Sequence, residues 1–509
     1  MNRWRLSLRV AASDHLAIIS TAVAFALIVV GLAVCREGWM DEFITYTYTN
    51  PLRSAFDLYT AYWAGEPSAP TYYLALWAWR KLIPPFGDLA SVRLLSVLAS
   101  LLLIATSLLA YDRLVRSRLG VFAAFLLCSP PLIFFAEEAR SYVFSFFGGV
   151  FIGIAFLAAL SSEHGAEGRS LFTIALTGAF GSLLCSVHLV SVMVAAFCLL
   201  SLAAIAMRRR DWRIAILSAA LAAFALLPGA APTLLLTSGV PSAVKVFWIT
   251  RWFVLQSILW LPALLGVPTV VLIVTVISNR WIKRASLEPL LRPAIYALAT
   301  AFAFLLLAFV FSMLKPVLTL RYLAAWVGFL IPATAFVAAW AISELSQSWK
   351  KVAVFAVIPC LIADTAAALA TPHHPGAWRE PGLYVRSLPS CRSTVIPVVL
   401  LTFVPAEGAW ADMFAWYAGG PDRFVPATEE NLNRAAAQSC PVRLWAAHLI
   451  PRYLSPAVQN AFVKSCQDNA VEVLTFDGGY LFVDAADREA LSHWTGSRST
   501  CAAVKQSLL

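Results

Sequence analysis

Two pairs of adjacent carboxylates are the side chains of this sequence best suited to do chemistry. The first pair, Asp41 and Glu42, lies in GWMDEFITY, and the second, Glu137 and Glu138, lies in FFAEEARSY. Aromatic residues flank both pairs and could exclude water, which raises the proton affinity of a carboxylate and suits it to act as a general base. A single acidic pair in a loop is usually only solvated. Two pairs favour a catalytic interpretation if the fold brings them to one side.

Two basic residues of one later loop carry the opposite charge. Lys315 and Arg321 bracket the segment KPVLTLRYL. Lys315 can equally be a helix-end lysine whose charge reaches the interface. Arg321 stands beside Tyr322 at the start of an apolar stretch, where a planar guanidinium matches a phosphate group. Carboxylates and a phosphate clamp on one face predict a reaction in which an acceptor hydroxyl loses its proton and a phosphate leaves.

The composition indicates that most of the chain lies in a membrane. Of the 509 residues, 60% are hydrophobic and 13% are charged, whereas a soluble chain carries about 25% charged residues. The net charge of +10 divides into +11 for residues 1–371 and −1 for residues 372–509. Because the positive excess belongs to the apolar part, it is explained by loops that fix membrane orientation. The charge therefore gives no reason to expect a nucleic-acid partner.

Apolar stretches predict a polytopic α-helical membrane protein with about eleven transmembrane helices in residues 1–371. A spanning helix needs about 20 mostly apolar residues. The candidate stretches are 16–35, 94–110, 119–136, 141–162, 171–187, 189–207, 214–236, 252–278, 293–314, 322–343 and 352–371. Arg3, Arg5 and Arg9 precede the first stretch, and no small-residue cleavage site follows it. We therefore expect a membrane anchor with a cytoplasmic N-terminus.

The segment 70–84 decides the sidedness of everything after it. It is short and aromatic, and Arg80 and Lys81 interrupt it, which favours a helix lying in the interface over a further span. Without it as a span, the later basic clusters all face the cytoplasm: Arg113, Arg116 and Arg118; Arg208–Arg210 with Arg213; Arg280, Lys283 and Arg284; Lys350 and Lys351. Positive-inside counting then places both acidic pairs and the C-terminus outside.

Six short motifs, in this order, resemble one known group of enzymes. They are Met40-Asp41-Glu42, EPSAPTYYLALWAW (66–79), RLLSVLAS (93–100), SPPLIFFAEEARSY (129–142), CSVHLV (185–190) and LRYLAAWVGFLIP (320–332). Across residues 15–345 the sequence is similar to the GT-C superfamily of polyprenyl-phosphate-sugar-dependent membrane glycosyltransferases. The nearest branch is the bacterial one related to protein O-mannosyltransferases and to lipid A and lipopolysaccharide-core glycosyltransferases.

The resemblance implies an inverting sugar transfer from a polyprenyl-phosphate donor on the periplasmic face. It implies that Asp41 is the base, with Glu42 beside it, and that Glu138 is a second catalytic acid. It also implies juxtamembrane helices in the outer loop 50–84. The candidate substrate-binding residues are Glu137, Arg140, Tyr142, His188, Lys315, Arg321 and Tyr322. A divalent cation, Mg or Mn, is left open, and Asp41 and Glu138 would be its ligands.

Two departures from the family pattern limit the resemblance. Many relatives have a His-Pro-Pro-like entry where this chain reads Ser68-Ala69-Pro70, so a histidine that could touch the donor or a metal is missing. The branch that transfers aminoarabinose to lipid A has a lysine near this point, and no residue here matches it. The resemblance therefore supports the superfamily more than that branch.

Residues 372–509 are expected to form a soluble, periplasmic α/β domain. Stretches 393–401, 441–449 and 471–485 have strand composition, and 427–438 and 455–466 are compatible with helices. This region holds Cys391, Cys440, Cys466 and Cys501. In an oxidising compartment four cysteines predict two disulfide bonds, with three pairings open, and the alternative is four unrelated thiols.

Two other functions compete with the glycosyltransferase. A transporter or flippase of lipid-linked sugars would keep ionisable groups at mid-membrane depth, where only Asp364 and His188 come close. A non-catalytic envelope assembly subunit would leave the acidic pairs merely solvated. We expect a multi-pass protein of the bacterial inner membrane whose partners are a polyprenyl-phosphate-linked sugar, the bilayer, and a glycan, lipid or protein acceptor.

Overall fold

The computed structural model describes most of the chain. The described residues are 12–36, 40–63, 70–83, 88–161, 168–237, 251–266, 269, 291–314, 318–343, 357–370, 379–400, 414–415, 417–420, 423–447, 471–476, 479–487, 491–492 and 496–499. The chain divides into two compact units. The first combines residues 1–36 with 51–371, and the second combines 37–50 with 372–509.

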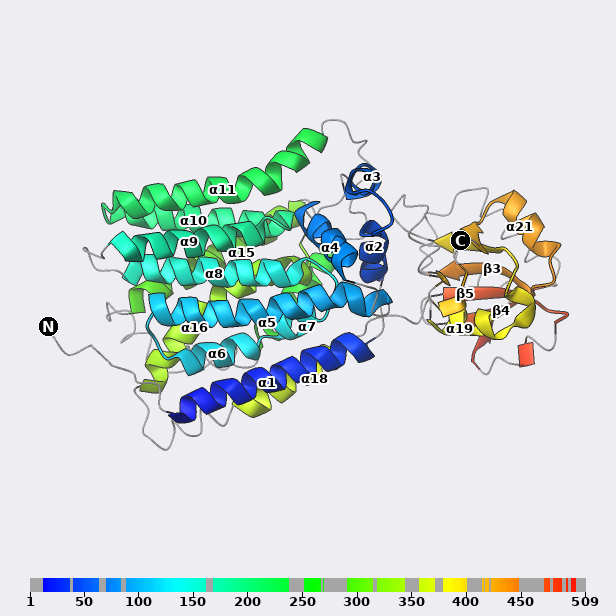
Figure 1. Ribbon diagram of the computed structural model, residues 1–509, viewed down its shortest axis with the longest axis horizontal. Coiled ribbons are helices and arrows are strands. Elements are labelled where there is room, and N and C mark those ends of the chain that lie inside the picture. Colours follow the sequence, from blue (N-terminus) through cyan, green and yellow to red (C-terminus); the bar gives the residue numbers. More distant parts are fainter. Residues whose placement is uncertain are drawn as a thin grey trace. The chain divides into compact units, whose positions relative to one another are not determined.

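The first unit is a bundle of helices (Figure 1). Its helices are α1 (Ala12–Cys35), α3 (Ala55–Ala61), α4 (Pro70–Leu82), α5 (Asp88–Leu114), α6 (Leu119–Leu127), α7 (Pro130–Ala136), α8 (Tyr142–Ser161), α9 (Gly168–Cys185), α10 (Leu189–Arg208), α11 (Trp212–Thr237), α12 (Arg251–Leu259), α15 (Arg292–Leu314), the 3₁₀ helix η3 (Leu320–Leu323), α16 (Ala324–Ser343) and α18 (Val357–Ala370). The segment 70–84, for which the sequence predicts an interfacial helix, thus contains the helix α4.

Several of these helices qualify as membrane spans. Within the described residues, five are long and apolar enough to cross a membrane, and a bent pair would make six. The shorter stretches 18–34, 171–185 and 212–227 are also apolar helices. The structure is therefore mostly helical with five or six span candidates, and the figure of about eleven spans stays a prediction.

The bent pair corrects one sequence-based expectation. The stretch 119–136, predicted as one span, forms α6 and α7, which meet at an angle of 58°. Pro130 and Pro131 explain the break, because a proline lacks the N–H that would continue the helix and disfavours helical backbone in the residue before it. Ser129 accordingly has extended dihedral angles, and Pro130 opens α7.

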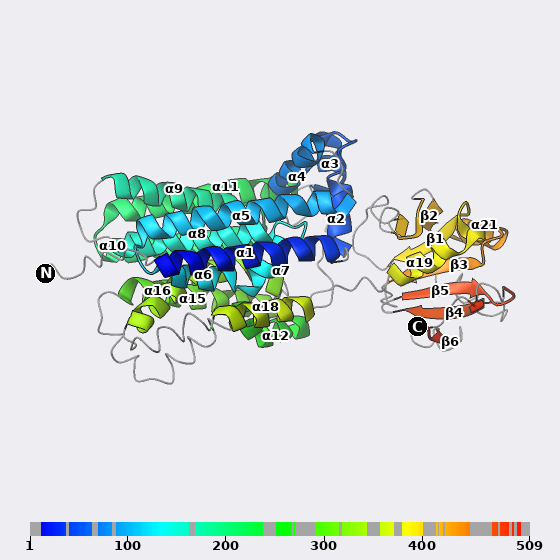
Figure 2. The same cartoon turned by 60° about the horizontal axis from the view of Figure 1, so that its bottom comes forward.

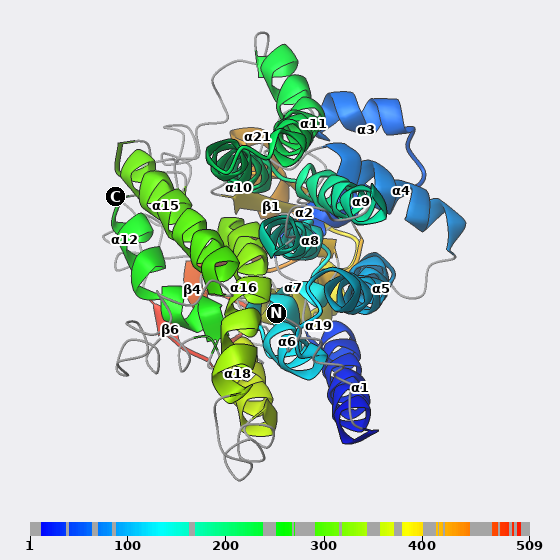
Figure 3. The same cartoon turned by 90° about the vertical axis from the view of Figure 1, so that its left-hand side faces the viewer.

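Helix α8 is the centre of the bundle, as Figure 3 shows end-on, and nearly all of its residues are buried. It packs against α16 at unusually close range. A Cβ atom built on Gly149 would lie 1.9 Å from the carbonyl oxygen of Ala325, and one built on Gly328 would lie 1.9 Å from that of Phe146. Glycine is needed at both positions because only a missing side chain lets the two backbones approach this closely.

The C-terminal ends of α8 and α10 lie together at one end of the bundle. Arg209 at the C-terminus of α10 donates a 3.0 Å hydrogen bond to the carbonyl of Leu160 at the end of α8. Its guanidinium also lies over the ring of Tyr296 near the start of α15, 5.5 Å from the ring centroid. The beginnings of α8 and α10 therefore lie at the opposite end, where Figure 1 also places α3 and α4.

The second unit contains helix α2 (Met40–Tyr48) together with the C-terminal strands and helices. Strands β1 (Ile396–Leu400), β2 (Phe424–Pro426), β3 (Val442–Ala447), β4 (Val471–Phe476), β5 (Gly479–Asp484) and β6 (Arg498–Ser499) form one sheet in the order β2-β1-β3-β5-β4-β6 (Figure 2). Strands β2, β1 and β3 are parallel, and the remaining pairings are antiparallel. The second unit also contains helices α19 (Arg379–Ser387) and α21 (Glu429–Ala436).

Several local contacts hold this unit together. Phe43 of α2 packs edge-on against Tyr417, with ring centroids 6.4 Å apart. A disulfide bond joins Cys391 to Cys440, which is one of the pairings left open by the sequence. Such a bond stabilises a domain by about 2–4 kcal/mol, chiefly by restricting the unfolded chain. Cys466 and Cys501, the other predicted pair members, lie outside the described residues.

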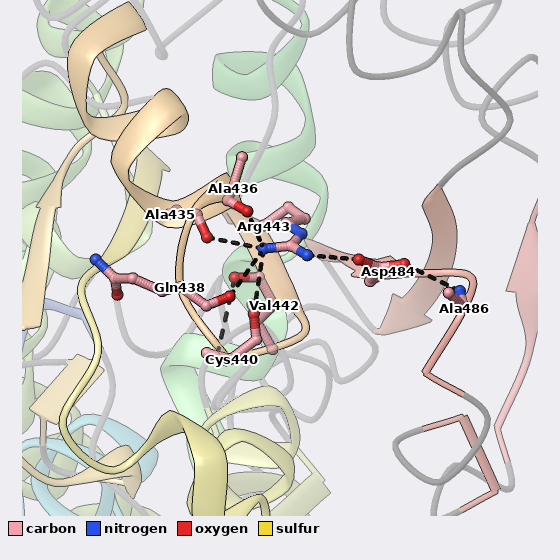
Figure 4. Close-up of polar contacts among 8 residues, drawn as sticks. All are labelled: Ala435, Ala436, Gln438, Cys440, Val442, Arg443, Asp484 and Ala486. Carbon is pink, nitrogen blue, oxygen red and sulfur yellow. Dashed lines mark hydrogen bonds and ion pairs between the residues drawn. The ribbon is translucent and has the colours of Figure 1, made fainter.

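Arg443 of β3 ties the end of α21 to the end of β5 (Figure 4). Its guanidinium donates hydrogen bonds to the carbonyl oxygens of Ala435 (2.8 Å) and Cys440 (3.4 Å) and to the carboxylate of Asp484. Burial alone would raise the pKa of Asp484. The hydrogen bonds from Arg443 and from the backbone N–H of Ala486 outweigh it and hold the pKa below its ordinary value of 3.8. This ion pair is a structural clamp within the C-terminal part of the unit.

Candidate active site

The acidic loop between α7 and α8 is buried at one end of the helix bundle. Glu137 and Glu138 are each only 1% exposed. The carboxylate of Glu137 forms an ion pair with the guanidinium of Arg36, which directly follows α1. That guanidinium also lies over the ring of Phe134, 5.0 Å from its centroid. A charge as deeply buried as that of Glu137 requires such a partner, since an unpaired ion inside a protein is costly.

A second buried arginine fixes the end of α1. Arg93 of α5 is 2% exposed and donates hydrogen bonds to the backbone carbonyls of Ala33 (2.9 Å) and Arg36 (2.6 Å). The last carbonyls of a helix have no partner within the helix and carry partial negative charge, so a guanidinium there is favourable. Arg93 therefore sets the position from which the side chain of Arg36 reaches the acidic loop.

The same loop contacts the predicted interfacial helix. Arg140 donates a 3.1 Å hydrogen bond to the hydroxyl of Tyr73 on α4. Tyr73 is fully buried, and its ring stacks on that of Trp63, with centroids 6.2 Å apart. The segments 50–63 and 70–83 are thereby anchored at the end of the bundle that holds the carboxylates.

Three rings from distant parts of the sequence meet beside this loop. Tyr142 opens α8, His188 precedes α10, and Tyr322 belongs to η3. The ring centroids of His188 and Tyr322 are 4.7 Å apart, and Tyr142 lies 5.6 Å from His188 and 6.5 Å from Tyr322. Arg321, half-buried, is the neighbour of Tyr322 in η3. The structure thus joins three of the segments that the sequence singled out.

His188 is a neutral imidazole in this cluster. Burial, together with the nearby positive charge of Arg140, lowers its pKa from the ordinary value of 6.5 to about 3. The Nδ1 atom has no hydrogen-bond partner among the residues that the structure describes, and the side chain does not cap α10. A buried polar atom of this kind is normally hydrogen-bonded. His188 can therefore offer a hydrogen bond to a polar ligand, such as a sugar hydroxyl.

The lowered pKa predicts a specific acid sensitivity. In the unfolded chain His188 would titrate at its ordinary value of 6.5, whereas in the folded chain it stays neutral down to about pH 3. Between these values only the unfolded state takes up the proton, so the folded state loses up to about 1.4 kcal/mol per pH unit as the pH falls. His188→Gln removes this contribution. We expect the thermal midpoint of the wild type to fall further between pH 7.5 and 4.5 than that of the variant, and equal falls would contradict the assignment.

The structure brings together most, though not all, of the predicted site residues. Those that meet within the bundle, or adjoin the residues that do, are Glu137, Glu138, Arg140, Tyr142, His188, Arg321 and Tyr322. Glu42 is fully buried in α2, which belongs to the other compact unit. The side chain of Asp41 and the whole of Lys315 lie outside what the structure describes.

A divalent cation gains no support from the part of the chain that is described. No three His, Cys, Asp or Glu side chains of that part are grouped to hold a metal ion. Since the side chain of Asp41, one of the two expected ligands, is not among them, the metal stays an open prediction.

Three residues of the site were not found by sequence reasoning. Arg36 looks like an ordinary flank of the first span, Arg93 like an ordinary flank of the second, and Tyr73 like one aromatic among several. The available signal was that Arg36 and Arg93 stand at the predicted outer ends of their helices, where positive-inside statistics disfavour a basic residue.

Comparison with solved structures identifies the architecture. The chain is similar to ArnT from Cupriavidus metallidurans in the apo state, with a TM-score of 0.53 and 15% sequence identity over 92% of this chain and 98% of that chain. It is equally similar to ArnT from the same organism bound to undecaprenyl phosphate, with a TM-score of 0.54 and 14% identity over 93% of this chain and 98% of that chain. The chain has the GT-C fold.

This fold is the one that the resemblance drawn from the six motifs implies. At identities this low, the likeness to the ArnT structures establishes the fold alone. No family model matches the sequence, and no curated protein matches it in a sequence comparison. What the GT-C site does in this chain must be inferred from its own residues.

Proposed function

We propose that this chain is an inverting glycosyltransferase that moves a sugar from a polyprenyl-phosphate donor to an acceptor at the periplasmic face of the bacterial inner membrane. The observation that carries the proposal is the meeting of the 137–142 loop with His188 and Tyr322 at one end of a GT-C bundle. One of the similar structures is bound to undecaprenyl phosphate, which supports a lipid donor of this class.

In the proposed reaction Asp41 is the general base. It takes the proton of the acceptor hydroxyl as that oxygen attacks the anomeric carbon of the sugar. The bond between that carbon and the phosphate oxygen breaks on the opposite face, so the anomeric configuration is inverted and polyprenyl phosphate leaves. Arg321, assisted by Lys315, stabilises the negative charge on the departing phosphate. Glu42 and Glu138 orient the base and the acceptor.

The electrostatics of the bundle end support an anionic donor. Buried or half-buried charged residues that the structure describes there include Arg36, Arg93, Arg140, Arg321, Glu137 and Glu138. Guanidinium groups outnumber carboxylates in this group, and buried charges of one sign raise the local concentration of a ligand of the other. The neutral His188 and the two tyrosine rings beside it supply apolar faces and hydrogen-bonding groups of the kind that bind a sugar ring.

The function is tested with the purified full-length chain in proteoliposomes and a panel of undecaprenyl-phosphate hexoses and aminosugars. Release of undecaprenyl phosphate, measured by mass spectrometry, together with an inverted anomeric product supports the transferase. Movement of an intact donor across the bilayer without release supports the flippase alternative. Neither release nor movement with any donor supports the assembly-subunit alternative.

Arg321→Ala is expected to weaken donor binding more than it weakens folding. A hydrogen bond to a charged group contributes about 1.5–3 kcal/mol, so affinity for undecaprenyl phosphate should fall about tenfold to hundredfold. The measurement is the Kd of the detergent-purified chain for undecaprenyl phosphate. Arg53→Ala is the matched control, because Arg53 is an exposed arginine before α3 whose guanidinium donates a 3.2 Å hydrogen bond to the hydroxyl of Tyr62. Unchanged affinity in the Arg321 variant would remove this residue from the site.

A further inference from the structure

The ion pair between Arg36 and Glu137 joins two stretches that are 101 residues apart in the sequence. Arg36 is the last residue before the segment 37–50, which contains the proposed base Asp41. Glu137 directly precedes Glu138, the second proposed catalytic acid. The pair is nearly inaccessible to water, with side-chain exposures of 10% and 1%. It therefore fixes the end of α1 to the loop that carries the second acidic motif.

Arg36 is held from both ends. Its carbonyl oxygen accepts a 2.6 Å hydrogen bond from the guanidinium of Arg93, which also bonds the carbonyl of Ala33 one turn earlier. Its own guanidinium contacts the carboxylate of Glu137 and the face of Phe134. The backbone at the end of α1 and the acidic loop are therefore fixed relative to each other by the side chains of two arginines.

Resting on the proposed function, we infer that Arg36 is a positioning residue for the sugar transfer. It holds the loop that carries Glu138 against the end of α1, and Glu137 is its counter-ion instead of a ligand of the substrate. Arg36 itself touches neither sugar nor phosphate. A displacement of about 1 Å in a catalytic group can cost about a hundredfold in rate, so loss of the pair should act on turnover and leave donor binding nearly unchanged.

The test compares Arg36→Ala, Arg36→Lys, Glu137→Ala and the double variant Arg36→Ala/Glu137→Ala in the full-length protein. Turnover is measured with whichever undecaprenyl-phosphate sugar the wild type consumes, and Kd is measured with undecaprenyl phosphate. We expect Arg36→Ala to lower kcat about a hundredfold with a Kd within about threefold of the wild type. Arg36→Lys, which keeps the charge, should restore most of the rate. The double variant should be no slower than either single variant, because both break one interaction.

Arg209→Ala is the matched control. It removes a half-buried guanidinium that faces an aromatic ring, as that of Arg36 does, but that bonds a backbone carbonyl at the opposite end of the bundle. We expect it to keep the wild-type kcat. Each variant is checked for folding by its elution as a single species and by its thermal midpoint. If Arg36→Ala does not fold, Arg36→Lys is compared with the wild type instead.

Several outcomes would overturn the inference. Wild-type turnover in Arg36→Ala would show that the pair positions nothing. A fall in donor affinity as large as the fall in kcat would make Arg36 a ligand of the phosphate. If the fold-loss of kcat in the double variant equalled the product of the fold-losses in the two single variants, the two residues would act independently. Asp41→Asn separates this question from the proposed function: if that variant is inactive while Arg36→Ala is fully active, only the positioning role fails, and if it is fully active, the proposed reaction itself fails.

Discussion

Replacing Asp41 with asparagine is expected to abolish sugar transfer while donor binding survives. Asparagine keeps the shape of the side chain and its place in α2 but cannot accept the proton of an acceptor hydroxyl. A general base contributes about 10²-fold to 10⁴-fold to the rate, and we expect a loss within that range. The measurement is release of undecaprenyl phosphate from the preferred donor, with the Kd for undecaprenyl phosphate determined in parallel.

Two comparisons give this result its meaning. Asp57→Asn is a control, because Asp57 is an acidic residue of the neighbouring segment that bonds Ser54 at the exposed start of α3, and it should transfer sugar at the wild-type rate. Glu42→Gln separates the two carboxylates of the motif, since Glu42 follows Asp41 in α2 and is fully buried. A larger loss in Glu42→Gln than in Asp41→Asn would reassign the base. Normal transfer in both variants would refute the mechanism.

The second large effect is expected from Gly149→Ala. The added methyl group would lie 1.9 Å from the carbonyl oxygen of Ala325, which is backbone and cannot turn aside. Helices α8 and α16 must therefore separate. Overpacking a core costs about 1–3 kcal/mol, and a clash with backbone places this variant at the upper end of that range. The measurement is the thermal midpoint and the yield of monodisperse protein.

The same substitution should also impair the site. Helix α8 begins at Tyr142 and α16 follows η3 with Tyr322, so separating the helices pulls apart the two tyrosine rings beside His188. Gly31→Ala in α1 is the control, because a Cβ atom there meets nothing within 4 Å, and alanine is favoured over glycine inside a helix. If Gly149→Ala were as stable and active as Gly31→Ala, the close packing of α8 on α16 would be wrong.

The sequence predicts the helices of the bundle better than their breaks. Runs of apolar residues locate α8, α10 and α15 almost to the residue, because a spanning helix has few other ways to satisfy its backbone. The same rule misses the bend at Pro130, where apolarity continues unbroken through 119–136 although the backbone cannot. Proline there is a local signal that outweighs the hydropathy of the stretch.

The sequence predicts which residues form the candidate site better than it predicts which of them are in contact. Counting positive loops places the 137–142 loop and His188 on one side of the bundle, and the structure brings them together with Tyr322. The partners Arg36 and Glu137 stand far apart in the sequence, and no spacing rule pairs them. Tertiary ion pairs depend on how helices pack, which an amino-acid pattern does not encode locally.

The grouping of residues 37–50 with the C-terminal strands has a practical consequence for protein engineering. Phe43 lies against Tyr417, so the short helix that carries Asp41 finds its packing partner more than 370 residues downstream. A chimaera that exchanges only residues 372–509 for those of a relative would leave this helix facing a foreign surface. Residues 37–50 and 372–509 therefore have to be exchanged together. The C-terminal region cannot be treated as a domain that folds independently of the short helix near the N-terminus.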